Sequence, residues 1–382
     1  MSECKFQIVG SLLRPRDLLV YKNKIEQRDD ITYPFYDDFP GYKECESQAV
    51  AQVIQEEIDH GIDVITDGEY TKSMWHLDFI WGLDGIERYI ADHGYTFKDH
   101  DGHSNFETRK DIGLRIIKPL SGKHHHFIDL FKQTKSLAQG RQVKLTVWSL
   151  AHAFTELSVF DHLYGPEQVY KTADDLKAGL IQAYKEFLDD YKAAGGTIIQ
   201  FDDCLWELFD PENPDSFFAE DNGDLPALAD GFVALNNVIA DYGHQLGLKV
   251  WTHNCRGNYA SRHASGGTYE AIAAKFLGEQ HYDRFFLEWD DERAGAISAL
   301  EALKDKEAEV VLGVLSSKTA ALDDEERALR LLDQAAKILP KERLFLSHQC
   351  GFASCDCGNE LTMAQEWAKI DQGQAIAKKF FG

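Results

Sequence analysis

The second half of the sequence holds four side chains suited to binding a transition metal. They are His253, Cys255, Glu288 and Cys350. Zinc accepts imidazole, thiolate and carboxylate ligands, and a pair of soft sulfur atoms disfavours magnesium or calcium. His253 and Cys255 stand two positions apart, so both can reach one ion where the chain bends at the end of a strand. The four residues therefore predict a zinc site assembled from distant parts of the chain.

Two other groups of similar residues are weaker candidates. Cys350, Cys355 and Cys357 lie close together, but the residues between them look like loop, and no second cysteine pair lies nearby to complete a four-cysteine site. Consecutive histidines at 124–126 point in different directions, so we interpret them as a surface run. Taken alone, a His-x-Cys pair indicates only a buried cysteine beside an ordinary histidine.

Reactive or polar residues follow a series of strand candidates. The candidates lie at residues 6–9, 63–66, 143–148, 197–201, 249–252, 284–288, 309–314 and 343–347. The residues at their carboxyl ends are Gly10, Ser11, Asp67, Gly68, Glu69, Trp148, Ser149, Asp202, Asp203, His253, Cys255, Glu288, Ser316, Ser317, Lys318 and Cys350. Catalytic groups of a barrel come from the carboxyl ends of several strands, so the series predicts one convergent site.

The elements that would position these residues alternate along the chain. The strand candidates are almost continuously apolar, as in parallel strands covered on both faces. Amphipathic helices are expected at residues 48–59, 173–194, 225–246, 269–277, 325–339 and 362–380. Eight strands alternating with helices predict an α/β fold, a (β/α)8 TIM barrel, rather than a doubly wound sheet. We expect residues 1–382 to form one catalytic barrel.

Long insertions interrupt the alternation after the second and the fourth strand. They span residues 75–141 and 206–226. Such insertions are commonly substrate lids or binding loops. The first begins with an aromatic group, Trp75, His76, Phe79 and Trp81, which could stack on a flat substrate but is more often core.

Composition excludes several classes of protein. The net charge of −24 disfavours binding to nucleic acid, which depends on neutralising phosphates with Lys and Arg. No apolar run reaches the ~18–20 residues of a membrane span, and the first residues lack the pattern of a secretory signal. The odd count of 7 cysteines argues against a disulfide framework. We expect a cytoplasmic protein that acts on small molecules, with no nucleic-acid or membrane partner, and we allow for a homo-oligomer.

These motifs resemble those of the cobalamin-independent methionine synthase family, in particular its short single-barrel members related to the C-terminal catalytic half. The segments that carry the resemblance are VGSLLRP at 9–15, ITDGEYTKSMWHLDFIWGLDG at 65–85, IQFDD at 199–203, THNCRGN at 252–258, FFLEWD at 285–290 and LSHQCGFAS at 346–354. The resemblance implies a methyltransferase that activates homocysteine as a zinc thiolate and yields methionine. It also implies that the four donor residues named above bind Zn2+.

The same resemblance assigns the substrate site. It implies that Gly10 and Ser11 contact the carboxylate of homocysteine, and that Glu69 and Asp202 hold its ammonium. Two carboxylates suit a cationic amine, because charge-assisted hydrogen bonds are strong. Asp202 and Lys318 are the residues we expect to act in catalysis, Lys318 by neutralising the departing group.

The sequence also departs from the family pattern. Asp203 stands where the family usually has Glu, Ser316 where Asp is usual, and Lys318 where the family places an acid–base His. The chain has no room for the second, N-terminal barrel that helps the full-length enzyme bind a polyglutamylated folate. The methyl donor is therefore open among a folate, a methylcorrinoid and a sulfonium compound.

Three other functions stay open at this point. A relative in the same superfamily could transfer an alkyl group from an epoxide to another thiol, such as coenzyme M. A zinc hydrolase would place water on the metal, but hydrolytic sites usually have nitrogen and oxygen ligands, because thiolates make zinc a poorer Lewis acid. A non-catalytic zinc protein would use closely spaced ligands, whereas these span Cys255 to Cys350.

Overall fold

A curled parallel sheet forms the centre of the molecule. The computed structural model describes residues 4–25, 33–34, 39–98, 104–160, 163–213, 216, 218 and 224–382. Seven parallel strands are joined in the order β1-β6-β7-β8-β9-β10-β11, which is also their order in the chain. Their bounds are β1 Val64–Ile65, β6 Gln142–Trp148, β7 Ile198–Asp203, β8 Lys249–Asn254, β9 Arg284–Glu288, β10 Glu309–Leu315 and β11 Leu344–His348.

The N-terminal segment lies against the last strand of this sheet. Phe6 forms an isolated parallel bridge with Leu346 of β11, and the Gln7 amide donates to the Leu346 carbonyl at 2.8 Å. The same segment also contacts the chain after β1, where Thr66 Oγ1 donates to the Gly10 carbonyl at 3.1 Å. The first predicted strand is thus reduced to a bridge, but it occupies the position expected of it.

An apolar cluster shows that the sheet curls around its own interior. The cluster is separate from the larger core and takes one residue from the N-terminal segment and one from each main strand except β6. Its members are Val9, Val64, Ile198, Trp251, Phe286, Val311 and Phe345. In a parallel barrel, inward-facing side chains meet in such layers. The structure therefore confirms a curled parallel α/β sheet of the TIM-barrel kind.

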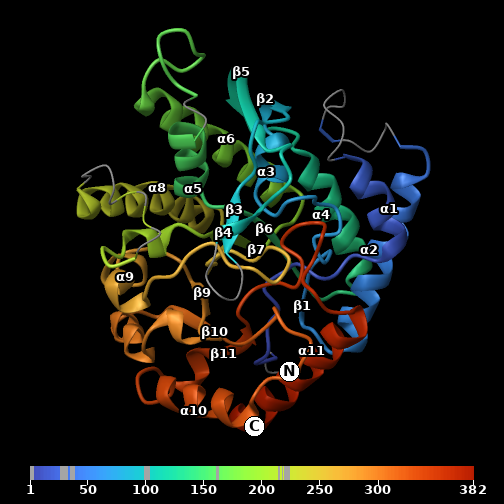
Figure 1. The fold of residues 1–382 in the computed structure, drawn as a ribbon, viewed down its shortest axis with the longest axis vertical. Helices are drawn as coiled ribbons and strands as arrows, with labels where there is room; N and C mark the ends of the chain where they lie inside the picture. The colour runs from blue at the N-terminus through green and yellow to red at the C-terminus, as the bar shows by residue number, and fades with distance from the viewer. Residues whose placement is uncertain are drawn as a thin grey trace.

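Helices pack around the outside of this sheet (Figure 1). They include α2 Tyr42–Asp59, α6 Ala173–Ala193, α8 Leu225–Gln245, α9 Tyr269–Phe276, α10 Glu325–Ala335 and α11 Met363–Phe381. All six predicted helices are present, and α6 and α11 begin with the capping boxes of Thr172 and Thr362. Helix α2 begins six residues before the predicted start at residue 48, because Tyr42 and Glu46 are buried on its inner face and bonded to each other at 2.7 Å.

The chain between β1 and β6 contains several further elements. They are α3 Leu77–Trp81, β2 Asp84–Tyr89, β3 Thr96–Lys98, β4 Ser104–Glu107, β5 Gly113–Ser121 and α4 His126–Leu137. Strand β2 pairs with β5 and β3 with β4, both antiparallel. The expectation that 124–126 form a surface run is wrong for His125. This residue is buried, caps α4 by accepting from the Phe127 amide, and stacks on Phe79.

The remaining elements are short, apart from α1 at the N-terminal end. They are α1 Arg16–Ile25, α5 Leu150–Thr155, the π-helix η2 Glu156–Phe160, and the 3-10 helices η3 Trp206–Phe209, η4 Glu292–Ala294, η5 Ile297–Leu303 and η6 Lys341–Arg343. The second predicted insertion, 206–226, begins with η3 and lies partly outside the described residues. Among the described helices, none combines the length and apolar character that crossing a bilayer requires. That the chain is a single catalytic domain stays a prediction.

Candidate metal centre

The carboxyl ends of neighbouring strands bring the four predicted donor residues together. His253 lies near the end of β8, Glu288 is the last residue of β9, and Cys350 follows β11. The ligand atoms of His253, Cys255, Glu288 and Cys350 all lie within 4.8 Å of one another, and all four residues are buried. The two sulfur atoms are 3.6 Å apart. This buried group is compatible with a metal ion such as zinc.

Atoms without partners in this group support the fit. Among the described residues, neither ring nitrogen of His253 nor Oε1 of Glu288 has a hydrogen-bond partner. Buried polar atoms are almost always hydrogen-bonded, because leaving one unsatisfied is unfavourable by about 1–3 kcal/mol. A metal ion ligated by His253 and Glu288 would satisfy them.

The donor residues shift one another's pKa values. Burial, followed by the neighbouring Cys350 sulfur, raises the pKa of Glu288 to about 8. Burial alone would lower the pKa of His253, but Cys350, Asp202 and Glu288 raise it to about 9. The hydrogen bond between the thiols raises the pKa of Cys255 well above its usual range and lowers that of Cys350. A divalent cation ligated by the four residues would instead favour their deprotonated forms, which are the forms that bind metal.

Backbone contacts hold the ligands in place. The Gly257 amide donates to Cys255 Sγ at 3.2 Å, and the Cys255 amide donates to the Asp203 carbonyl at 2.8 Å. Arg256 Nη1 donates to the Glu288 carbonyl at 3.2 Å. Because these bonds tie the end of β8 to both β7 and β9, the donor side chains are positioned before any ligand arrives.

Gly10 lies beside Glu69, and Ser11 lies beside the loop after Cys350. A side chain at Gly10 would come within 3.4 Å of Glu69 Oε1 and 3.3 Å of Thr146. Ser11 packs against the loop after Cys350, where its carbonyl accepts from the Phe352 amide at 2.8 Å. The two residues therefore border both Glu69 and the metal-ligand loop.

Glu69 has a partner that the sequence reasoning missed. Lys72 Nζ lies 3.0 Å from Glu69 Oε1 and 2.7 Å from Thr146 Oγ1, and Thr146 itself donates to Glu69. Burial opposes ionisation of Glu69, but Lys72 and Thr146 outweigh it, so the pKa of this carboxyl is lowered. The sequence signal for this pair was the spacing of three residues between Glu69 and Lys72, which both belong to the motif at 65–85.

Asp202 and Asp203 point to different surroundings. Asp202 accepts from Gln200 Nε2 at 2.7 Å, and burial raises its pKa to about 7, with His253 lowering and Glu69 raising it. Asp203 accepts from Ser149 Oγ at 2.8 Å and from the Leu205 amide at 3.1 Å. The pKa of Asp202 therefore depends on His253 of the candidate metal centre and on Glu69. Asp203 instead links β7 to Ser149, the residue that follows β6.

Lys318 is held in an ion-pair cluster. Its Nζ lies 2.8 Å from Asp290 Oδ2 and 3.3 Å from Asp291 Oδ2. Burial would lower the pKa of Lys318, but Asp290 and Glu288 raise it. Ser316 Oγ accepts a hydrogen bond from the Lys318 amide at 3.2 Å. A catalytic role for Lys318 stays a prediction.

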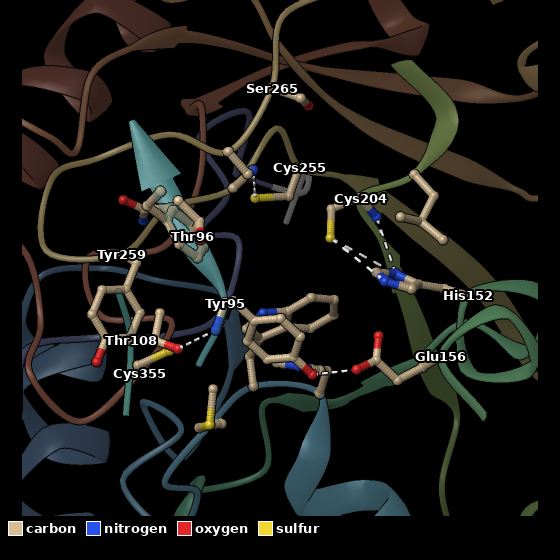
Figure 2. Close-up of a pocket in the computed structure, with 18 of the residues that line it drawn as sticks. Tyr95, Thr96, Thr108, His152, Glu156, Cys204, Cys255, Tyr259, Ser265 and Cys355 are labelled. Atoms are coloured by element: carbon tan, nitrogen blue, oxygen red, sulfur yellow. Dashed lines mark hydrogen bonds between the residues drawn. The ribbon is translucent and has the colours of Figure 1, made fainter. Parts of the chain in front are cut away.

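A cavity of about 270 Å³ opens beside Cys255 (Figure 2). Trp75 and His76 line it, whereas Phe79 and Trp81 are buried in the core, so the predicted aromatic group is divided between the two. Sequence reasoning missed most of its other walls. These include Tyr95, Phe97, His152, Glu156, Cys204 and Tyr259. The available signal was the spacing of four between His152 and Glu156 after a predicted strand, which places both on one helical face.

Comparisons with solved structures identify the fold. The chain is similar to a putative vitamin-B12 independent methionine synthase from Listeria monocytogenes, with a TM-score of 0.71, 23% identity, and coverage of 100% of this chain and 99% of that one. It is also similar to a B12-independent methionine synthase from Shewanella sp. W3-18-1, with a TM-score of 0.68, 19% identity, and coverage of 99% and 98%. The fold implied by the motifs is thus confirmed over the full chain.

A comparison of sequences identifies the family. No protein-family model matches the chain. YxjH of Bacillus subtilis is 32% identical over 329 residues, which cover 86% of this chain and 83% of YxjH. The chain belongs to the family of YxjH.

Proposed function

We propose that the chain is a zinc-dependent methyltransferase whose acceptor is the thiol of homocysteine and whose product is methionine. The observation that carries the proposal is the buried group of two thiols, one imidazole and one carboxyl, with ligand atoms within 4.8 Å of one another. Cys255 belongs to this group and also lines the adjoining cavity, so an incoming thiol has space beside the metal ligands.

The donor set suits thiol chemistry. When bound, zinc would keep an acceptor thiol as the nucleophilic thiolate at neutral pH. Ligands rich in sulfur leave the site electron-rich, which favours a nucleophilic sulfur over activated water, and this argues against a hydrolase. A closed structural site is disfavoured because the ligands come from separate strands and one of them, Cys255, borders a cavity.

The acceptor's charged groups find partners beside the donor set. Asp202, buried with a raised pKa of about 7, would accept the ammonium group and would ionise as the cation arrives. Gly10 and Ser11 would contact the carboxylate. The Shewanella methionine synthase was solved in complex with selenomethionine, which supports an amino-acid ligand of this size in the fold.

One observation favours a second acceptor class. Lys72 already forms a buried ion pair with Glu69. The carboxylate that was expected to hold the ammonium of homocysteine is therefore already paired with a lysine of the protein itself. A thiol without an amino group, such as coenzyme M, would not need that carboxylate. Alkyl transfer to such a thiol is therefore the second candidate, and comparing homocysteine with coenzyme M distinguishes the two.

The test uses zinc-loaded protein and X-ray absorption at the zinc edge. Adding homocysteine should increase the number of sulfur ligands around zinc, and an added methyl donor should then yield methionine. If coenzyme M increases the number of sulfur ligands around zinc and homocysteine does not, the second candidate acceptor is supported. An unchanged sulfur count with homocysteine, cysteine and coenzyme M would overturn thiol activation.

A further inference from the structure

The cavity beside Cys255 has walls suited to a cation (Figure 2). The aromatic rings of Trp75, Tyr95, Phe97 and Tyr259 line it. Aromatic faces carry negative potential and attract cations with about 0.5–2 kcal/mol, the larger value where the cation is desolvated. A volume of about 270 Å³ matches a small ligand rather than a drug-sized one.

Glu156 adds an acidic group to the same wall. It is buried, lines the cavity, and accepts a hydrogen bond from the Tyr95 hydroxyl. Glu156 is the first residue of the π-helix η2, which continues α5, and π-helical turns occur often at functional sites. His152, one turn earlier, lines the cavity as well. The local fold thus presents a carboxylate to the space beside the metal ligands.

The described residues of the same walls carry no lysine or arginine charge. Burial lowers the pKa of His76 to about 3 and that of His152 well below its usual range, so both imidazoles stay neutral. Among the described lining residues, a donor with phosphate groups or a chain of carboxylates would meet neither lysine nor arginine, whereas a cation would meet aromatic rings and the side chain of Glu156.

We propose that this cavity binds a small sulfonium cation, which serves as the methyl donor. The inference rests on the proposed function, because it names the second substrate of that reaction. The acceptor sulfur forms a bond to the methyl carbon while the bond from that carbon to the sulfonium sulfur breaks. The electron pair of the broken bond stays on the departing sulfur, which leaves as a neutral thioether. The thiol proton has already passed to solvent, so the overall products are a methylated acceptor, a thioether and a proton.

This chemistry fits the residues around the cavity. A neutral thioether needs no proton as it leaves, unlike the amine of a folate, so the site requires no general acid. The imidazoles of His76 and His152 are neutral, and Lys318 is paired with Asp290 and Asp291 and is absent from the residues that line the cavity. A sulfonium donor thus fits a cavity whose imidazoles are neutral and whose lining residues do not include Lys318.

Direct binding tests the cation site without relying on turnover. Isothermal titration of the zinc-loaded protein compares trimethylsulfonium with tert-butanol, a neutral molecule of similar size. Trimethylsulfonium should bind at least about tenfold more tightly, and Glu156→Gln should remove most of that preference. Glu186→Gln is the matched control, because Glu186 also accepts from a hydroxyl, that of Ser121, but lies outside the cavity. Equal binding of the two molecules, or an unchanged preference in Glu156→Gln, would overturn the proposal.

Donor competition separates this proposal from the proposed function. With homocysteine as acceptor, S-methylmethionine carrying a labelled methyl group should give labelled methionine, whereas methyltetrahydrofolate and methylcobalamin should not. Transfer from either of those two while sulfonium compounds stay inert would overturn the sulfonium site and leave thiol activation standing. If no thiol enters the zinc sphere in the absorption experiment, the proposed function itself fails, whatever the cavity binds.

Discussion

Cys255 belongs both to the candidate metal group and to the cavity wall, which makes the ligand set testable residue by residue. Removing a thiolate ligand leaves three donors, and affinity for zinc depends on the full set. We expect Cys350→Ser to lose bound zinc and turnover, as measured by metal analysis after dialysis. Cys357→Ser is the control, because Cys357 is exposed and outside the group, and it should keep its zinc. Full zinc content in Cys350→Ser would contradict the assignment.

A second residue-scale prediction concerns the pair of Glu69 and Lys72. Removing one member of a buried ion pair is unfavourable by about 3–5 kcal/mol, because the other charge is left without its partner. Lys72→Met should therefore lower the free energy of unfolding by roughly that amount, and adding Glu69→Gln should recover part of the loss. Denaturant unfolding of both single variants and the double variant measures the coupling. Strictly additive losses would show that the pair is not coupled.

Glu69 also separates metal binding from acceptor binding. It lies outside the group of metal ligands, so Glu69→Ala should retain zinc. If Glu69 helps to hold the ammonium of homocysteine, the variant should raise the KM for homocysteine by tenfold or more, about 1.4 kcal/mol. An unchanged KM for homocysteine would favour the acceptor without an amino group.

At the scale of elements, Glu366 links helix α11 to the N-terminal segment. Its carboxyl accepts from the Leu13 amide at 3.0 Å, and burial raises its pKa to about 8. The folded state therefore keeps a proton that the unfolded chain loses near pH 4.5, so the contribution of Glu366 to stability is present below that pH and is lost as the pH rises toward 8.

Glu366→Gln tests this linkage, because glutamine stays neutral and retains an oxygen for the Leu13 amide. The stability of the variant relative to the original protein should rise between pH 4.5 and 8, with a slope of up to about 1.4 kcal/mol per pH unit. Denaturant unfolding at several pH values measures the difference. A difference independent of pH would contradict the raised pKa of Glu366.

Most elements follow from periodicity, and the discrepancies have local causes. The strand candidate at 284–288 matches the bounds of β9. All five residues of β9 are buried, as expected for a parallel strand covered on both faces. The small sheets of the first insertion escaped detection. Strand β3 Thr96–Lys98 is short and at most half-buried, and β5 Gly113–Ser121 has an irregular burial pattern, so neither shows the continuous apolar run of the main strands. Residues 206–226 remain partly outside the described chain.

At the scale of the whole molecule, the metal would join parts of the chain that the sheet brings together. The candidate ligands from β8, from β9 and from the loop after β11 come together only in the folded state, so zinc bound by them would stabilise folding. Free zinc at one hundred times its Kd should add about 2.7 kcal/mol to the free energy of unfolding. Chelation should lower the Tm of the loaded protein, and Cys350→Ser should show no such shift. Equal shifts in both proteins would place the zinc elsewhere.

The α/β alternation and the polar residues after each strand could be predicted from the sequence, because the apolar period is a local property. The four candidate metal ligands were predicted from their donor chemistry together with the motifs that contain them. Neither the pairing of Lys72 with Glu69 nor the cavity of Tyr95, His152 and Glu156 could be read in this way. These contacts join segments separated by turns and insertions, and their geometry depends on how the sheet curls and the helices pack. The proposed sulfonium donor rests on that packing, since burial determines which of the cavity's side chains carry charge.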